Sequence, residues 1–298
     1  MRIGIFAGDG SLDELVDLAR RAESDGFDSF WLPQIFGIDA LCAHTLIGHE
    51  VPRIELGTAV VPTYPRHPAV LAGAALTASA ASGGRFTLGI GLSHQLVIEG
   101  MYGYSFDKPV RHMREYLSVL VPLLSGEAVD FEGETVTAKV GLAVPGAPPV
   151  PVLVAALGPK MLRLAAERTA GTVTWMTGPR TLAEHTVPTI TEAADAAGTG
   201  AMRVVGALPV AVTDDPDAVR AKAAKVFAVY GILPSYRAML DREGVDGPED
   251  VALIGSAAAV RAGIGRMRDA GVTDFVAVEF NTDEPIATAT REVLREFV

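Results

Sequence analysis

The chain has 298 residues, of which 49% are hydrophobic, and it carries a formal net charge of −11. A chain of this length and hydrophobic content can bury a large core, either as one barrel or as two smaller domains. The acidic balance argues against nucleic acid as a partner, and no apolar run reaches the roughly 18 residues that a membrane-spanning helix needs.

Short runs rich in β-branched residues alternate with longer amphipathic runs along the chain. The short runs predict strands at residues 2–7, 29–32, 54–61, 85–91, 152–156, 172–176, 204–212 and 275–278. The longer runs predict helices at residues 12–25, 39–50, 67–82, 108–124, 160–169, 182–197, 216–230, 257–270 and 285–297. Strands that alternate with helices lie parallel and are joined by crossovers, and eight such units in about 300 residues are typical of a barrel. We therefore predict an α/β fold, a (β/α)8 TIM barrel with insertion segments; a doubly wound sheet is the alternative.

Three stretches interrupt this alternation. Residues 126–150 form a predicted excursion with a hairpin near 128–140, because they lack the apolar residues for a core of their own. Residues 93–107 and 230–253 are long for connections between strands and helices, and long loops of compact folds are often functional. We predict one domain over residues 1–298, with these two loops as lids.

The ends of the predicted strands carry small and apolar residues and few ionisable ones. In a TIM barrel the loops after the strands build the active site. The fourth strand ends in Gly89-Ile90-Gly91, and such an ending lets a ligand approach bare backbone. Free N–H groups suit the oxygens and phosphates of a flat ring system. The pattern predicts a phosphorylated redox cofactor at this mouth rather than a hydrolase site.

Five candidate residues have a structural interpretation beside the functional one. Gly158 precedes a predicted helix whose free N–H groups and dipole favour an anion, and Lys160 adds a charge there or is simply solvated. His94 donates a hydrogen bond or a proton near neutral pH, or is satisfied within its loop. Trp175 stacks on a ligand or packs in the core. Gln34 binds at the mouth or lies on the surface.

Other chemistries find little support in the sequence. Cys42 is the only cysteine, which excludes an intrachain disulfide and a thiolate metal site and favours a cytoplasmic location. His44 and His49 lack the spacing of a zinc-binding helix, so we predict no metal. Arg66 is expected to pair with a carboxylate, and His112 is expected on an exposed helix face.

Several segments together resemble the bacterial luciferase-like family of flavin and deazaflavin oxidoreductases. These segments are residues 57–60, 66–68, 82–91, 115–117, 151–152, 156–160 and 170–171, and they run in order over most of the chain. Within the family, the chain is more similar to members that use the deazaflavin coenzyme F420 than to the FMN-dependent luciferases. The resemblance implies a barrel with an insertion, a homodimer and a cofactor across the strand ends. Deazaflavin sugar-phosphate dehydrogenases of the family have an Asp-His pair where this chain has Pro33-Gln34, so a sugar-oxidising histidine is not expected there.

The resemblance also implies roles for individual residues. The end of the third strand would carry a non-prolyl cis peptide bond that bulges against the cofactor ring, and Gly91, Ser93 and His94 would approach the ring or its side chain. The phosphate would meet the start of the helix after the fifth strand, with Thr177 and Gly178 nearby. With Gln34 and Trp175, the predicted cofactor-binding residues are Gln34, Ala59, Val60, Val61, Gly91, Ser93, His94, Leu157, Gly158, Pro159, Lys160, Trp175, Thr177 and Gly178. His94 is the predicted catalytic residue, as a proton donor.

The favoured hypothesis is a coenzyme F420-dependent oxidoreductase that transfers a hydride between the deazaflavin and a small organic substrate. The apolar residues Tyr102, Phe106, Tyr230, Tyr236 and Met239 would line the lids. An FMN-dependent luciferase-like monooxygenase is the first alternative, and a non-catalytic flavin-binding protein is the second. The expected partners are the substrate and a second copy of the chain, with neither nucleic acid nor a membrane.

Overall fold

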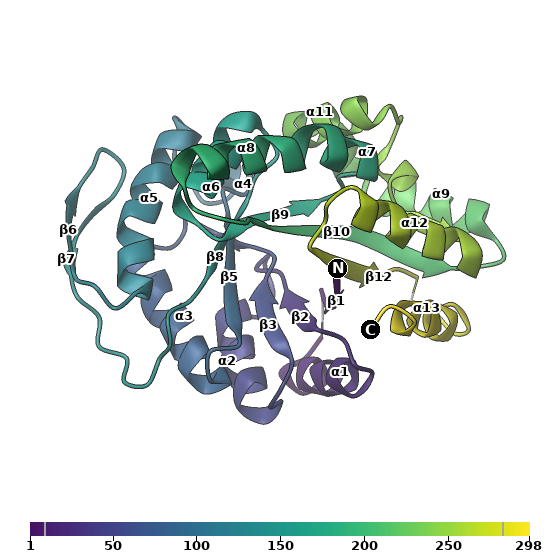
Figure 1. Ribbon diagram of the computed structural model, residues 1–298, viewed down its shortest axis with the longest axis horizontal. Helices are drawn as coiled ribbons and strands as arrows, with labels where there is room; N and C mark the ends of the chain where they lie inside the picture. The colour runs from purple at the N-terminus through teal and green to yellow at the C-terminus, as the bar shows by residue number, and fades with distance from the viewer. Residues whose placement is uncertain (9, 282) are drawn as a thin grey trace.

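A closed ring of eight parallel strands forms the centre of the structure, and helices cover its outer face (Figure 1). The computed structural model describes residues 1–8, 10–281 and 283–298. In the order in which they pair, the ring strands are β1 (Arg2–Phe6), β2 (Ser29–Leu32), β3 (Glu55–Thr58) with β4 (Val61–Pro62), β5 (Phe86–Gly91), β8 (Val152–Ala155), β9 (Gly171–Trp175), β10 (Arg203–Val212) and β12 (Asp274–Glu279). Parallel pairing of β12 with β1 closes the ring and confirms the predicted TIM barrel.

Two groups of helices surround this ring. The outer layer consists of α1 (Leu12–Ser24), α2 (Ala40–Glu50), α3 (Pro68–Ser82), α5 (Pro109–Leu124), α6 (Pro159–Arg168), α8 (Val187–Ala197), α12 (Ala257–Asp269) and α13 (Ile286–Arg295). The second group lies in the connections that follow strands: α4 (Gln95–Gly100), α7 (Pro179–Thr181), the π-helical turn η1 (Leu182–Thr186), α9 (Pro216–Val226), α10 (Ala228–Ile232), α11 (Pro234–Glu243) and the 3-10 turn η2 (Pro248–Asp250). No helix within the described residues is long and apolar enough to cross a membrane.

The start of α1 shows how local sequence sets an element. The Ser11 side chain accepts a hydrogen bond from the Glu14 backbone N–H, and the Glu14 carboxylate accepts one from the Ser11 N–H at 2.7 Å. This capping box satisfies N–H groups that a helix start leaves free. The buried residues Leu15, Val16 and Ala19 then recur at helical spacing and face the barrel.

Inside the ring, side chains lie in layers. At the amino ends of the strands, Arg203 donates to both oxygens of Asp274, at 3.0 and 2.7 Å, and to Glu55 at 2.6 Å. The fully buried Trp31 fills the middle layer. Only glycine fits at position 57 beside it, because a Cβ on Gly57 would lie 2.4 Å from the indole. The amino end and the middle of the barrel are therefore filled by side chains.

The hairpin of β6 (Val129–Glu132) and β7 (Thr137–Val140) extends away from the barrel at one side of the molecule (Figure 1). The Glu115 carboxylate on α5 accepts hydrogen bonds from the Thr135 N–H and hydroxyl, both at 2.7 Å, and so anchors the turn. The predicted hairpin is confirmed. It belongs to the predicted excursion at residues 126–150.

Four expectations differ from the structure. The third predicted strand is two strands, β3 and β4, with Ala59 and Val60 between them. The stretch 93–107 contains α4, and 230–253 contains α11 and η2, so neither is an irregular loop. The helix expected at 216–230 is divided into α9 and α10. The three-residue strand β11 (Leu253–Gly255), which pairs with the end of β10, was not predicted because so short a buried run has no readable period.

Candidate functional site

Small residues form the inner wall of the barrel at the carboxyl ends of β3, β5 and β8. A Cβ on Gly91 would lie 2.7 Å from Val60 Cγ2 and 3.2 Å from the Ala155 Cβ, so these three residues lie close together. The Ala59–Val60 peptide bond is cis, as the resemblance implied. Ala59, Val60 and Ala155 are only half-buried. The wall is thus flat, apolar and accessible, which suits the face of an aromatic ring.

Trp175 lies at the carboxyl end of β9, and aromatic residues of the lid helices cover it. Its indole is 5.7 Å from the Phe227 ring and 6.0 Å from the Tyr230 ring, both in edge-on geometry. The indole N–H is buried and makes no hydrogen bond of good geometry to any described residue, although the Tyr230 phenol lies beside it. A buried donor without an acceptor is costly. The site therefore offers a hydrogen bond to a ligand that reaches Trp175.

His94 follows β5 and is half-buried under the lid. Its ring centroid lies 5.8 Å from that of Tyr236, which packs edge-on against Tyr230 at 4.8 Å. Burial lowers the pKa of His94 and raises the pKa of Tyr236. Both side chains are therefore uncharged at neutral pH. A histidine in such a position can take up a proton and donate it to a neighbouring group.

The connection from β8 to α6 forms one rim of this mouth. Gly158 is the N-cap of α6, its carbonyl accepts from the Met161 and Leu162 N–H groups, and a Cβ there would meet no atom within 4 Å. Lys160 is exposed. His185 Nε2 donates to the Leu157 carbonyl at 2.8 Å and so fixes the connection from the side. This rim has the backbone, the space and the cation that an anionic group needs.

The neighbouring rim, after β9, is already occupied by a side chain from the lid. The Glu243 carboxylate of α11 accepts hydrogen bonds from the Thr181 N–H at 2.7 Å and the Arg180 N–H at 3.2 Å. It lies directly over Gly178, where a Cβ would be 2.3 Å from it. Thr177 is buried, and its hydroxyl donates to the Trp175 carbonyl at 3.3 Å. In this conformation neither Thr177 nor Gly178 is free to contact a ligand.

Two further predicted residues face away from the mouth or are already engaged. Val61 is fully buried in the core between the ring and the helices, so its side chain cannot contact a cofactor in the barrel. The Gln34 carbonyl oxygen accepts from the Ala40 N–H at 2.9 Å and from Arg66 at 3.4 Å, which positions the start of α2. Arg66 also pairs with Asp39, as expected from the sequence.

A stack of aromatic residues beside the mouth was not predicted. Tyr64 and His112 lie face to face with centroids 4.0 Å apart, and Phe106 stacks on Tyr64 at 5.3 Å. His112, expected on an exposed face, is buried and bonded to the Thr63 hydroxyl at 3.0 Å. Burial lowers its pKa to about 4 and raises the pKa of Tyr64 to about 12. The only sequence signal was the position of Tyr64 just after the third strand.

Among the described residues, no group of three or more His, Cys, Asp or Glu side chains could hold a metal ion. A cavity of about 340 Å³ lies between the ends of β1 and β2 and is lined by Leu15, Ile35, Phe36 and neighbouring residues. The fit to a cofactor rests on the flat wall at Gly91, the unpaired Trp175 N–H and the open rim at Gly158. These features suit a flat ring with an anionic side chain, provided that the lid aromatics move aside.

Known proteins are similar to this chain in sequence or in architecture. The model of the luciferase-like monooxygenase family matches residues 1–278. The 5,10-methylenetetrahydromethanopterin reductase of Methanolobus tindarius is 30% identical over 284 residues, which cover 94% of this chain and 86% of the reductase. An F420-dependent secondary alcohol dehydrogenase, solved with an F420–acetone adduct, superimposes with a TM-score of 0.82 at 22% identity over 100% of this chain and 98% of its own. The FMN complex of the oxygenating constituent of 3,6-diketocamphane monooxygenase from Pseudomonas putida gives 0.77 at 18% identity, over 99% and 97%.

Proposed function

The chain belongs to the family of luciferase-like monooxygenases, and from that premise we propose that it is a coenzyme F420-dependent oxidoreductase acting on a small organic substrate. The observation that carries the proposal is the wall of Ala59, Val60 and Gly91 at the carboxyl ends of the strands, together with the buried N–H of Trp175, a residue that packs against the same core cluster as Ala59 and Val60. The names of the relatives support the cofactor, since the alcohol dehydrogenase was solved with F420.

The cofactor supplies the hydride chemistry when it is bound. The chain's own residues bind, orient and shield it. Gly91 and Val60 offer a flat apolar face, and Trp175 offers an N–H donor. Gly158 and Lys160 form the rim for an anion, and the segments 93–107 and 230–253 act as lids that exclude water.

His94 is proposed to deliver the proton that accompanies substrate reduction. We expect His94→Gln to bind F420 within about threefold of the native protein but to lower kcat by about 10²-fold or more. Burial lowers the pKa of His94 below the ordinary value of about 6.5. The imidazolium donor therefore accumulates only as pH falls, so kcat for reduction should rise with falling pH and level off below that depressed pKa.

The pH profile of kcat for His94→Gln checks this role. The variant should lose the dependence on pH that the native protein shows on the acid side. A variant with lowered kcat but the native pH profile would show that His94 only positions other groups.

An FMN-dependent monooxygenase remains the alternative, favoured by the structural likeness to the FMN complex. Turnover of reduced F420 with a panel of carbonyl and unsaturated acceptors, alongside oxygen uptake with reduced FMN, separates the two. The proposal expects acceptor-dependent F420 oxidation without oxygen uptake. Oxygen consumption with FMN and no F420 oxidation would favour the alternative, and turnover of neither would favour a flavin-binding protein.

We further propose a homodimer through the outer face of α2 and α3. Helix α3 has no charged residue in its 15 positions, and Val70 on it is 67% exposed. Helices that are apolar all round are normally covered. Sedimentation should show a dimer that Val70→Glu dissociates, whereas Val226→Glu on α9 should leave it intact; a monomeric native protein would contradict the proposal.

The cytoplasmic location stays a prediction.

A further inference from the structure

The lid helices contact the candidate cofactor residues at separate points. Tyr236 of α11 packs on His94, and Tyr230 of α10 packs on Trp175. Glu243 at the end of α11 is bonded above Gly178. These helices therefore do more than shield the mouth: their aromatic rings pack on His94 and Trp175, and a carboxylate lies on the rim.

Glu243 binds as an anionic ligand would bind. Its two carboxylate oxygens accept from two successive backbone N–H groups, those of Arg180 and Thr181. Phosphate oxygens accept from the same kind of donor. The glycine at position 178 leaves the space that the carboxylate fills. A second bond, from the Thr181 hydroxyl to the Met239 carbonyl at 3.1 Å, holds α11 in this place.

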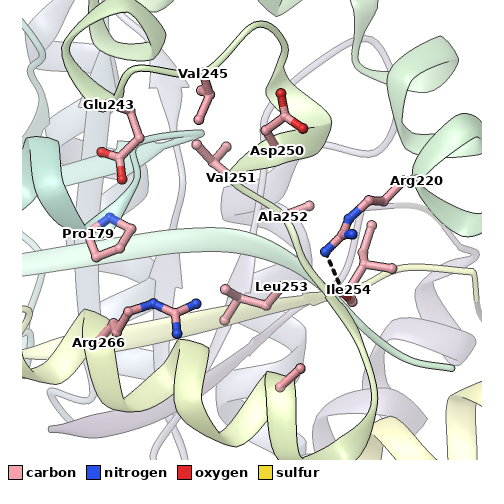
Figure 2. A pocket seen from close by; sticks show the side chains of 11 residues that line it. Pro179, Arg220, Glu243, Val245, Asp250, Val251, Ala252, Leu253, Ile254 and Arg266 are labelled. Carbon is pink, nitrogen blue, oxygen red and sulfur yellow. Dashed lines mark hydrogen bonds between the residues drawn. The ribbon is translucent and has the colours of Figure 1, made fainter. Parts of the chain in front are cut away.

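A cavity of about 230 Å³ adjoins Glu243 and is large enough to accommodate its carboxylate in a second position (Figure 2). Glu243 lines it from α11, and the guanidinium groups of Arg266 and Arg220 line it from the other sides. Arg220 donates to the Ile254 carbonyl at 2.9 Å. Arg266 makes no ion pair or side-chain hydrogen bond over the described part of the chain. A Glu243 carboxylate that left the backbone amides would find both room and a cation.

We infer that α10 and α11 are an internal competitor for the cofactor, and that Glu243 holds the place of the cofactor's phosphate on the rim after β9, beside the Gly158 rim that we assign to the same anionic side chain of the cofactor. This inference rests on the proposed function. Because Glu243 must leave the Arg180 and Thr181 N–H groups before a phosphate can bind them, the measured affinity for a phosphorylated ring is reduced by the fraction of molecules in which these groups are free, whereas a phosphate-free ring meets no such competition. Glu243 thereby determines how strongly the site distinguishes a phosphorylated cofactor from a dephosphorylated one.

The test compares two deazaflavins that differ only in the phosphate: the phosphate-free riboflavin analogue FO and its 5′-phosphate. Fluorescence titrations are made with the native protein, Glu243→Gln and Glu243→Ala. Glu184→Gln is the matched control, because Glu184 is an exposed carboxylate paired with Arg180 that does not touch these amides. The ratio of the two affinities should shift toward the phosphate by about tenfold in Glu243→Ala, less in Glu243→Gln, and not in the control.

Hydrogen exchange supplies a readout that needs no turnover. Without ligand, the Arg180 and Thr181 amides should exchange faster in Glu243→Ala than in the native protein. The phosphorylated deazaflavin should restore protection, and FO should not. If the folded variants keep the native affinity ratio, or bind the phosphate form more weakly, the competitor role is wrong while the cofactor assignment stands. If no protein binds either deazaflavin, the proposed function itself fails.

Discussion

Gly91→Leu is expected to weaken F420 binding by at least about 100-fold, which corresponds to about 2.7 kcal/mol. A Cβ at this position already lies 2.7 Å from Val60 Cγ2, and the rest of the leucine side chain has to extend into the mouth. The flat wall would be replaced by a projecting side chain where the ring has to lie. Gly91→Ala should have a smaller effect, because only one methyl group must be accommodated.

Fluorescence titration measures the loss, and circular dichroism with thermal unfolding shows whether the barrel is kept. Overpacking at this site should cost about 1–3 kcal/mol of stability, which leaves most of a barrel of this size folded. Gly265→Leu on α12 is the matched control, since no atom lies within 4 Å of its Cβ position. Native affinity in a folded Gly91→Leu protein would place the cofactor elsewhere.

Arg203→Met is expected to lower the free energy of unfolding by about 3–5 kcal/mol, because it leaves the Asp274 carboxylate buried without its main partner. The guanidinium makes two hydrogen bonds to Asp274 and one to Glu55, and the Asp274 side chain is only 2% exposed. The Arg203 guanidinium carbon also lies over the Trp31 ring, 5.6 Å from its centroid, and methionine keeps an unbranched apolar side chain at this position.

Urea unfolding provides the measurement, and a second substitution supplies the check. Arg203→Met combined with Asp274→Asn should recover part of the loss, since the orphaned charge is removed. Arg261→Met, which breaks an exposed pair with Glu296, should change stability little. An equally small effect for Arg203→Met would mean that the network at the barrel floor does not stabilise the fold.

The barrel itself was predictable because its strands and outer helices each show a recognisable pattern of hydrophobic residues in the sequence. Alternation of strand and helix determines parallel pairing, and the small residues at the strand ends marked the mouth. The placement of Gly91, His94 and Trp175 at or just beyond the carboxyl ends of barrel strands follows from that geometry. What the sequence could not show is how the connections fold back, because that depends on contacts between distant residues.

For three residues, the contacts that decide their roles are made only in the folded chain. The inward and outward alternation of side chains along a strand is interrupted between Thr58 and Val61. The sequence therefore did not show that the Val61 side chain points outward into the core. Gln34 was assigned to the mouth from its position after the second strand. Its actual partners, the Ala40 N–H and Arg66, come near it only when the loop folds, so the sequence did not reveal them. Glu243 gave no local signal, since the Thr181 N–H that it binds is 62 residues away in the chain.

Separate titrations of the purified protein with F420 and with FMN test the central claim most directly. The claim is that the carboxyl ends of the strands receive a deazaflavin ring against bare backbone. We expect saturable binding of F420, at least about tenfold tighter than that of FMN, a difference of about 1.4 kcal/mol. Tighter binding of FMN, or binding of neither, would contradict it.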